Sequence, residues 1–329
     1  MTKAIRIHET GGPDVLRWED VEVGRPGPGE VRIRHTAVGL NYIDTYQRSG
    51  LYPLSLPSGI GLEAAGVVEE VGEGVLHVKP ADRVAYAGGP AGAYAQVRVM
   101  PAAPLVKLPE SIADIQAAAI LLQGLTAQYL VRRTYKPTSG DIVLLHAAAG
   151  GVGLIVSQWL SALGVTVIGT VGSEAKAELA KHHGCTHTIQ YTTENFAERV
   201  REITDGRGVP VVYDSVGKDT WEGSLNCLQP FGLMVSFGNS SGAVPPVNIG
   251  QLAAKGSLYL TRPALATYTA KREDLEAMAA DLFEVIANGS VKTEVRQIYA
   301  LKDAAQAHID LEARKTSGSS VLTPSGSVA

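Results

Sequence analysis

Cysteine is scarce in this chain: the 329 residues include only two, Cys185 and Cys227. Two thiols cannot form the disulfide framework of a small secreted domain, and they cannot make a four-thiolate zinc site. The remaining common use of cysteine is as a small apolar side chain in a reducing compartment. We therefore expect both residues to be free thiols and the protein to be cytoplasmic.

Strong charge and long apolar segments are missing as well. The chain has 29 Lys and Arg against 33 Asp and Glu, for a net charge of −4, and no basic cluster stands out. That balance predicts no electrostatic attraction to nucleic acid or to anionic membranes. No run approaches the roughly 18 apolar residues of a membrane-spanning helix. The start of the chain, MTKAIRIHETGGPDV, lacks the pattern of a signal peptide.

The sequence pattern changes between the two halves of the chain. The first 120 or so residues contain short β-like runs separated by turn signals such as PGPGE and GGPAG, which predicts an antiparallel, barrel-like or sandwich-like β domain. From about Asp141, short apolar runs alternate with helical stretches, which predicts a doubly wound parallel sheet. Chains longer than roughly 250–300 residues usually divide into two domains, and the change of pattern fits that division.

The tail beyond Pro263 resembles neither half by itself. A helical segment at 270–289, with apolar residues three and four apart, is followed by the strand-like RQIYAL, another helix and the strand-like SSVL. We predict that this tail returns to the first half and makes that domain discontinuous. The expected boundaries are 1–124 with 264–329 for the β-rich domain and 125–263 for the α/β domain.

The most specific local pattern is LLHAAAGGVGLI at 144–155, where a buried strand leads through small residues into a helix. The dinucleotide fingerprint is G-x-G-x-x-G, and Ala148 occupies its first position here. Gly150 would let the backbone approach a pyrophosphate, and Gly153 would let the helix pack close to the strand. The N-terminus of the helix would supply N–H groups and a positive dipole end. This stretch predicts a dinucleotide site.

The end of the next strand distinguishes between the two nicotinamide dinucleotides. NAD enzymes usually carry an acidic residue there, which accepts a hydrogen bond from the ribose 2′-hydroxyl. This chain reads GTVGSEAK at 169–176, with a hydroxyl at Ser173 and a cation at Lys176. A 2′-phosphate would be stabilised by that cation. Glu174 is a counter-indication, although a carboxylate in the first turn of a helix also complements the helix dipole. We predict NADPH as the cofactor.

Glu63 is the unusual residue in the glycine-rich, apolar stretch GIGLEAAGVVEEVGEGV at 59–75. A buried carboxylate is costly unless it is paired or hydrogen-bonded. Glu63 could be a metal ligand, a catalytic acid or a structural charge with a partner, and the stretch itself does not decide among them.

Several segments together resemble one family over essentially the whole chain. They are GLNYIDTYQRSGLYP (39–53), GLEAAGVVEEVG (61–72), DRVAY, HAAAGGVG, YDSVG and SFGNSSG. They resemble the zinc-free quinone oxidoreductases of the medium-chain dehydrogenase/reductase superfamily, which include ζ-crystallin. The resemblance implies a GroES-like catalytic domain built from both ends of the chain, a Rossmann domain, NADPH, a quinone substrate and a homodimer.

Two departures from the zinc alcohol dehydrogenases of the same superfamily bear on metal binding. Asn41 stands where those enzymes have cysteine, and Leu62 stands where they have histidine. A catalytic zinc needs about three protein ligands, and only Glu63 would remain. We therefore expect no metal and a paired or hydrogen-bonded Glu63 near the cofactor, with a proton relay as the alternative. On that basis Glu63→Gln is expected mainly to lower stability.

The resemblance also implies site residues. Asn41 and Tyr46 would lie near the nicotinamide ribose and ring, and Tyr52 and Gln123 would face the substrate; the alternatives are turn packing for Tyr52 and a helix-surface amide for Gln123. Lys176 could instead be a solvated helix residue, and Arg314 could likewise be a solvated surface residue. The remaining implied cofactor residues are Tyr129, Gly150, Gly151 and Val152 at the pyrophosphate and nicotinamide end, Gly172, Ser173, Lys176 and Tyr191 at the 2′-phosphate and adenosine, Ser215, Phe237, Gly238, Asn239 and Ser240 at two further strand ends, and Arg314 from the C-terminal part.

The resulting hypothesis is a zinc-independent NADPH:quinone reductase. An NADPH-dependent enone or enoyl-thioester reductase would need the same fold and is the nearest alternative. A non-catalytic NADPH- or RNA-binding protein of the ζ-crystallin kind is the alternative from another class, and the net charge of −4 argues against RNA binding. The segment GSLYLTRP at 256–263 would end the parallel sheet, so we expect two such edges to pair in a homodimer.

Overall fold

The computed structural model describes residues 1–324 and divides the chain into two compact units. The β-rich unit contains residues 1–123, 271–279 and the chain from Thr293 to the end of the described part. The α/β unit contains residues 124–270 and 280–292. Each unit thus draws on separate segments of the chain. The domain boundaries expected from the sequence stay a prediction, because these units reflect packing rather than independent folding.

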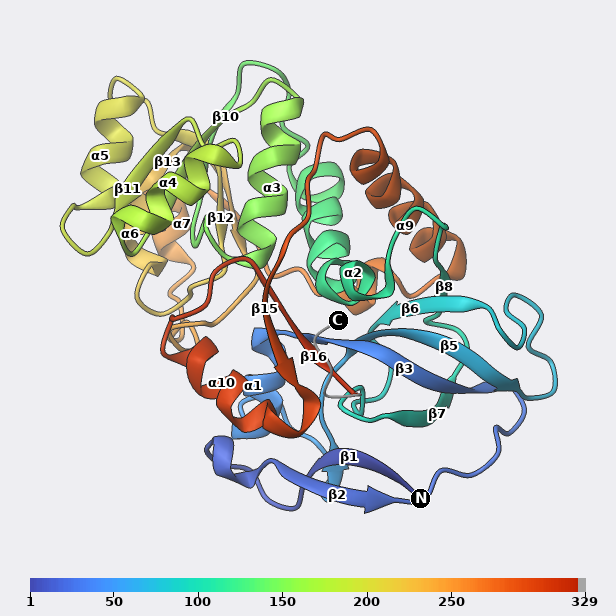
Figure 1. Ribbon diagram of the computed structural model, residues 1–329. Coiled ribbons are helices and arrows are strands. Elements are labelled where there is room, and N and C mark those ends of the chain that lie inside the picture. Colours follow the sequence, from blue (N-terminus) through green and yellow to red (C-terminus); the bar gives the residue numbers. More distant parts are fainter. Residues whose placement is uncertain (325–329) are drawn as a thin grey trace. The chain divides into compact units, whose positions relative to one another are not determined.

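The β-rich unit is built around a seven-stranded sheet in the order β15-β16-β3-β5-β6-β8, with β7 also pairing with β3 (Figure 1). All its pairs are antiparallel except β15 with β16, which run parallel. A second sheet has the order β2-β1-β4. The strands and helices are β1 (Thr2–Ile7), β2 (Arg17–Val21), β3 (Glu30–Leu40), α1 (Tyr42–Ser49), β4 (Ser58–Gly59), β5 (Glu63–Val71), β6 (Arg83–Ala87), β7 (Val97–Pro101), β8 (Val106–Lys107), β15 (Val295–Ala300), α10 (Ala304–Glu312) and β16 (Ser319–Thr323), with single 3-10 turns at Pro13–Val15 and Leu301–Asp303.

Alternation of apolar and polar residues explains why β3 lies at the centre of this sheet. Its residues from Glu30 to Thr36 alternate between buried and more exposed positions, and Ile33 and Val38 belong to the core. β16 pairs with β3 through Val321 opposite Gly39. The tail of the chain therefore supplies two strands and a helix to a sheet begun near the N-terminus, as the sequence pattern predicts.

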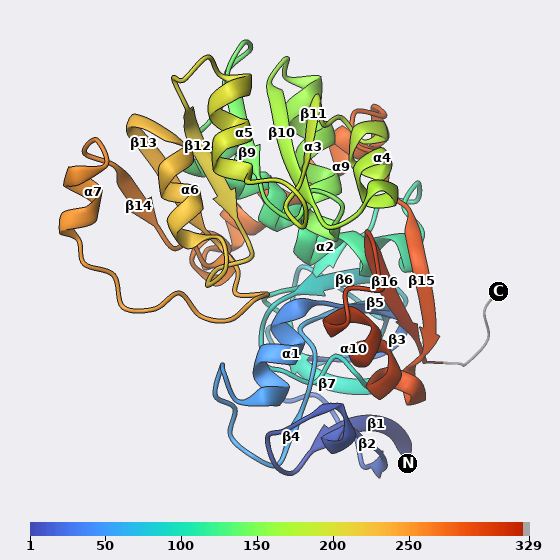
Figure 2. The ribbon, with the colours of Figure 1, turned by 90° about the vertical axis from the view of Figure 1, so that its left-hand side faces the viewer.

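The α/β unit contains a six-stranded sheet in the order β11-β10-β9-β12-β13-β14, and all its pairs are parallel. Figure 2 shows these strands in sequence from β11 to β14, with α7 beside the β14 end. The elements are β9 (Ile142–Leu145), α3 (Gly151–Ala162), β10 (Thr166–Val171), α4 (Glu174–His182), β11 (His187–Gln190), α5 (Phe196–Ile203), β12 (Val209–Asp214), α6 (Trp221–Cys227), β13 (Leu228–Ser236), α7 (Gly250–Ala254), β14 (Tyr259–Thr261) and α8 (Leu265–Tyr268).

Two long helices and one irregular turn complete the chain. α2 (Asp114–Tyr129) is followed by a π-helical turn at Leu130–Thr134, and α9 (Arg272–Ala287) follows α8. Cys185 and Cys227 are buried free thiols, as expected. Among the described residues, no helix is both long enough and apolar enough to cross a bilayer.

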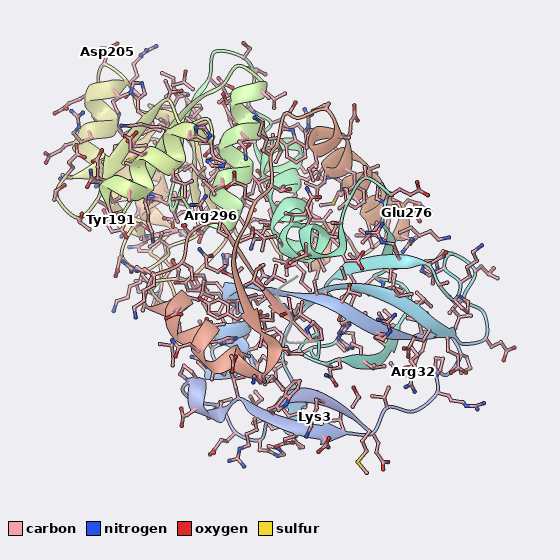
Figure 3. All side chains as sticks on the ribbon, in the orientation of Figure 1. Lys3, Arg32, Tyr191, Asp205, Glu276 and Arg296 are labelled. Carbon is pink, nitrogen blue, oxygen red and sulfur yellow. The ribbon has the colours of Figure 1, made fainter. Side chains whose placement is uncertain are left out.

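The strand order of the α/β unit fixes where a ligand can bind. β9 lies between β10 and β12, so the chain leaves β9 toward one side and later returns to its other side. In an open parallel sheet such a reversal separates the loops at the carboxyl ends of the two neighbouring strands, and ligands bind there. Figure 3 labels Tyr191 after β11, near this end of the sheet, and Asp205, which precedes β12, near the opposite end.

Candidate functional site

The glycine-containing loop after β9 is held tightly against the strand. A Cβ on Gly153 would lie only 2.4 Å from the carbonyl oxygen of Ala147 and 2.7 Å from that of Ala148. Ala148 is buried, and its methyl group would lie only 2.6 Å from a Cβ added to Gly169 of β10. The alanine in the first fingerprint position is therefore accommodated by a glycine in the neighbouring strand.

The start of α3 is shaped to receive an anion. Gly150 is the N-cap residue, with φ −81° and ψ 172°, and α3 begins at Gly151. The first N–H groups of a helix have no carbonyl acceptor within the helix, and the helix dipole adds positive charge there. A Cβ on Gly150 would meet one atom within 4 Å, the Ala147 carbonyl oxygen at 3.2 Å, so the other side of this residue is open. Gly150, Gly151 and Val152 thus fit a dinucleotide pyrophosphate.

The end of β10 brings together the residues expected around the adenosine. A Cβ on Gly172 would lie 2.7 Å from the Tyr191 hydroxyl oxygen, so Gly172 permits close packing of the Tyr191 side chain. The Ser173 hydroxyl caps α4 by accepting the N–H of Lys176 at 3.4 Å. The Glu174 carboxylate accepts a hydrogen bond from the Gln190 side chain. Glu174 thus has a partner on β11, while Ser173 remains exposed.

The loops after β12 and β13 are joined by backbone contacts. The N–H of Ser240 donates to the carbonyl oxygen of Ser215 at 3.2 Å, and a Cβ on Gly238 would lie 2.4 Å from the same oxygen. Phe237 donates its N–H to the Asp214 carbonyl at 2.8 Å. The candidate residues Ser215 and 237–240 therefore form one local structure at the carboxyl end of the sheet.

Tyr129 lies at the end of α2 and is buried. Its ring stacks on that of Tyr268 from α8, with centroids 4.5 Å apart and an angle of 8° between the planes. Burial raises the pKa of Tyr129, so the hydroxyl stays protonated.

Glu63 is the centre of the candidate site in the β-rich unit. Its side chain is fully buried. The amide nitrogen of Asn41 donates to Oε2 at 2.6 Å, and the backbone N–H of Leu122 donates to Oε1 at 2.6 Å. A Cβ on Gly39 would lie 2.2 Å from Oε2, so only glycine leaves room for the carboxyl there. The expectation of a hydrogen-bonded Glu63 is confirmed.

Burial also sets the protonation state of Glu63. Desolvation raises its pKa to about 8, against the opposing effect of the hydrogen bonds from Leu122 and Asn41. The carboxyl is therefore largely protonated at neutral pH. Within residues 1–324, no group of three or more His, Cys, Asp or Glu side chains is arranged to hold a metal ion.

A chain of amides continues from Glu63 to the C-terminal strand. Gln123 donates to the Asn41 amide oxygen at 3.3 Å and accepts from the Ser319 hydroxyl at 2.7 Å. Gln123 is buried rather than at the helix surface, so the helix-surface alternative is wrong. Each amide nitrogen carries two hydrogens, and one of the two is used in this chain.

Tyr46 and Tyr52 form the aromatic part of the site. Their rings meet edge to face with centroids 5.3 Å apart, and the N–H of Tyr52 donates to the Tyr46 carbonyl at 3.0 Å. Tyr46 is buried in α1, and Tyr52 follows that helix.

Arg314 is exposed in the turn after α10, with a positive φ of 58°. The Tyr42 hydroxyl of α1 donates to the Leu311 carbonyl at 3.0 Å, which attaches α1 to the end of α10.

Sequence reasoning missed Asp44, which is buried one turn after Asn41. Its Oδ2 accepts the backbone N–H of Asn41 at 2.9 Å and the hydroxyl of Tyr94 at 2.9 Å. Burial raises the pKa of Asp44 to about 7. The signal was present as Asn-x-x-Asp at 41–44, because an acidic residue three positions after an N-cap commonly bonds back to the N-cap N–H. Asp44 thus holds the start of α1, from which the Asn41 side chain reaches Glu63.

Comparison with known proteins agrees with both units. Residues 27–110 match the alcohol dehydrogenase GroES-like domain, and residues 151–284 match the zinc-binding dehydrogenase family. A quinone oxidoreductase of Pseudomonas aeruginosa is 56% identical over 98% of this chain and 100% of that protein. A 2-haloacrylate reductase of a Burkholderia species is 48% identical over 98% of this chain and 99% of that protein.

A solved structure gives the same result. The crystal structure of Escherichia coli quinone oxidoreductase complexed with NADPH matches with a TM-score of 0.96 and 52% identity, covering 98% of this chain and 100% of that one. Identity above 50% along the whole chain confirms the resemblance expected from the sequence motifs, and it confirms the GroES-like and Rossmann folds. The chain therefore belongs to the quinone oxidoreductases of the medium-chain dehydrogenase/reductase superfamily.

Proposed function

We propose that this chain reduces quinones with NADPH. The observation that carries the proposal is the whole-chain identity of 56% to a quinone oxidoreductase, combined with a dinucleotide loop whose tight glycine and open N-cap are both intact. The chain is an NADPH-dependent quinone oxidoreductase.

The α/β unit supplies the residues that hold the cofactor. The start of α3, at Gly150, Gly151 and Val152, binds the pyrophosphate, because its N–H groups and dipole favour negative charge. Ser173 and Lys176 bind the 2′-phosphate, with Gly172 and Tyr191 beside them. The proposed remaining contacts come from Tyr129, Ser215, Phe237, Gly238, Asn239 and Ser240, and, in the other unit, from Asn41, Tyr46 and Arg314.

The β-rich unit supplies the residues that orient the reactants. Bound NADPH supplies the hydride, and the negative charge that the substrate gains collects on quinone oxygens. The amide nitrogens of Asn41 and Gln123 and the hydroxyls of Tyr46 and Tyr52 are the donor groups that we assign to those oxygens. Glu63 acts indirectly: its carboxyl accepts from Asn41 and so fixes which way that amide points.

The direct test is NADPH oxidation with 1,4-benzoquinone and with 9,10-phenanthrenequinone. Turnover is expected with both, and NADPH should exceed NADH in kcat/KM by at least about tenfold, because a cation stabilises a 2′-phosphate. Lys176→Ala should reduce that preference by raising KM for NADPH while leaving KM for NADH nearly unchanged. Absence of turnover above background with both quinones would contradict the proposal.

A second candidate function is reduction of an activated carbon–carbon double bond. It is favoured by the 48% identity to a 2-haloacrylate reductase, which spans almost the whole of both chains. Such an enzyme would need the same cofactor site and would place hydride on carbon. Measuring turnover with a crotonyl thioester and an alkenal beside the quinones distinguishes the two, since the quinone proposal requires the higher kcat/KM for quinone.

We further propose that the reaction needs no metal. Asn41 and Leu62 stand where the related zinc enzymes have cysteine and histidine, and Asn41 is already hydrogen-bonded to the one remaining candidate ligand, Glu63. Three protein ligands are needed for a catalytic zinc. The same quinone assay in the presence of a strong chelator should therefore give unchanged rates.

A homodimer through β14 is also proposed. β14 is the edge strand of the parallel sheet, and its Tyr259 and Leu260 are 62% and 41% exposed. Two such edges could pair antiparallel across a two-fold axis and cover both side chains. Sedimentation that finds a monomer at micromolar concentration would contradict this arrangement.

A further inference from the structure

A buried chain of polar side chains crosses the α/β unit beneath the strand ends. His146 follows β9, and its Nδ1 lies 2.9 Å from the hydroxyl of Thr170 in β10. Its Nε2 lies 3.0 Å from the hydroxyl of Ser224 in α6, and that hydroxyl lies 2.8 Å from Oδ2 of Asp214 at the end of β12. All four side chains are at most 1% exposed.

The carboxylate at one end determines the direction of every hydrogen bond in this chain. Asp214 Oδ1 accepts the N–H groups of Val216 at 2.8 Å and Gly217 at 3.0 Å, and Oδ2 accepts the hydroxyls of Thr220 at 2.7 Å and Ser224 at 2.8 Å. Four donors occupy the four lone-pair positions of a carboxylate, so Asp214 only accepts. The proton of Ser224 is therefore committed to Asp214.

The histidine tautomer follows from this direction. Because the Ser224 hydroxyl gives its proton to Asp214, it must accept from His146, and Nε2 carries the hydrogen. Nδ1 of the neutral ring is then an acceptor, and Thr170 donates to it. Burial lowers the pKa of His146, which favours this neutral ring. Although Ser224, His146 and Asp214 are the residue types of a hydrolase triad, His146 donates to the serine and cannot act as its base.

Three of the four members, His146, Thr170 and Asp214, lie next to loops that carry proposed cofactor contacts. His146 directly precedes the loop 147–150, and Thr170 accepts the N–H of Ala148 through its carbonyl at 3.1 Å. Thr170 lies two residues before Gly172. Asp214 precedes Ser215, and its carbonyl accepts the N–H of Phe237 at 2.8 Å. The chain of hydrogen bonds therefore connects the loops after β9, β10, β12 and β13 on the side of those loops that faces the sheet.

We propose that Thr170, His146, Ser224 and Asp214 are positioning residues of the NADPH site, which hold these strand ends in register through one directed chain of hydrogen bonds. The inference rests on the proposed cofactor role of the loops. It assigns cofactor affinity to buried side chains, which expose no surface to the ligand. A structural role without effect on the cofactor would lower stability alone.

The test is the Kd for NADPH, measured without quinone from the fluorescence of the nicotinamide. Thr170→Val keeps the side-chain shape but removes the donor to His146, so the Kd should rise about tenfold. Thr170→Ser keeps the hydroxyl and should restore the Kd to within about twofold of wild type. Because quinone is absent, a lack of quinone turnover would contradict the proposed activity without affecting this result.

Thr204→Val is the matched control. Thr204 is also buried in the α/β unit and donates its hydroxyl to the Val200 carbonyl at 2.8 Å, but it follows α5, at the opposite end of the sheet from the cofactor loops. Its loss should lower the melting temperature while leaving the Kd for NADPH within about twofold. An unchanged Kd in a folded Thr170→Val protein, or an equal rise in Thr204→Val, would overturn the proposal.

A second readout tests the direction of the chain itself. Nitrogen chemical shifts of His146, assigned with a His146→Gln variant, should show Nε2 protonated and Nδ1 unprotonated in the wild-type protein. In Thr170→Val, Nδ1 loses its donor while Ser224 still accepts from Nε2, so the ring should keep the same tautomer and only the Nδ1 shift should move toward that of an unbonded nitrogen. A wild-type ring protonated at Nδ1 would overturn the assignment.

Discussion

Replacing Gly153 with alanine is expected to raise the Kd for NADPH by at least about 100-fold. The added Cβ would lie 2.4 Å from the Ala147 carbonyl oxygen and 2.7 Å from that of Ala148. Both are backbone atoms, so no side-chain rotation relieves the contact and α3 must move away from the loop. That movement displaces the N–H groups of Gly151 and Val152 that are proposed to bind the pyrophosphate. Fluorescence titration with NADPH measures the effect, and circular dichroism shows whether the fold persists.

Gly232→Ala provides the control for this substitution. Gly232 lies in β13 of the same sheet, and a Cβ there would lie 2.9 Å from the Gln229 carbonyl oxygen and 2.9 Å from a Leu228 methyl group. This variant should lose some stability, since it also crowds a backbone oxygen, but it should bind NADPH like wild type. If Gly153→Ala bound NADPH with wild-type affinity, the close packing of α3 against the loop would not matter for the cofactor.

The dinucleotide loop shows which parts of the site could be predicted from the sequence. Its strand, small-residue turn and helix are contiguous, so the spacing of Ala148, Gly150 and Gly153 already contains the geometry. The residues after β10, β11, β12 and β13 were also predictable, because parallel strands place their carboxyl ends on one edge. The polar residues beneath these loops gave no such signal, since Thr170, Asp214 and Ser224 lie far apart in the sequence.

The β-rich unit shows the limit of sequence reasoning more clearly. Its central polar chain joins Glu63, Asn41, Gln123 and Ser319, and no local pattern relates these positions. Gln123 illustrates the consequence: α2 is apolar around much of its circumference, so the sequence alone did not distinguish a surface amide from a buried one. Only the pairing of β16 with β3 brings Ser319 to it. The sequence likewise indicated that Glu63 needs a partner without indicating that it would be protonated.

The protonation of Glu63 leads to the second large effect: the difference in stability between Glu63→Gln and the wild-type protein should change sign with pH. The pKa of Glu63 rises to about 8 in the folded protein from 4.5. Between these values the folded state holds one proton more than the unfolded state, so the free energy of unfolding falls as pH rises, by up to about 1.4 kcal/mol per pH unit. The stabilisation is fully present below pH 4.5 and is lost as the pH passes 8.

A glutamine at position 63 resembles the protonated carboxyl and does not titrate. Its amide oxygen can still accept the N–H of Leu122, but its amide nitrogen cannot accept from Asn41, so Glu63→Gln should be less stable than wild type by about 1–3 kcal/mol at pH 5. At pH 9 the wild-type protein must bury a carboxylate, and the variant should be the more stable by roughly 1–3 kcal/mol. The expectation from the sequence, that this substitution mainly lowers stability, therefore holds at most on the acid side. Urea unfolding of both proteins from pH 5 to pH 9 measures the difference.

The Asp44→Asn variant separates the pH dependence caused by Glu63 from the pH dependence caused by the neighbouring Asp44. Burial raises the pKa of Asp44 to about 7 from 3.8, so Asp44 also makes stability fall with rising pH, in a window that ends about one unit lower than that of Glu63. The charge of Asp44 further raises the pKa of Glu63, so Asp44→Asn should move the remaining decline to lower pH. The double variant should show the flattest profile. If Glu63→Gln were less stable than wild type by the same amount at pH 5 and pH 9, Glu63 would keep one protonation state throughout, and the role of burial in setting that state would be wrong.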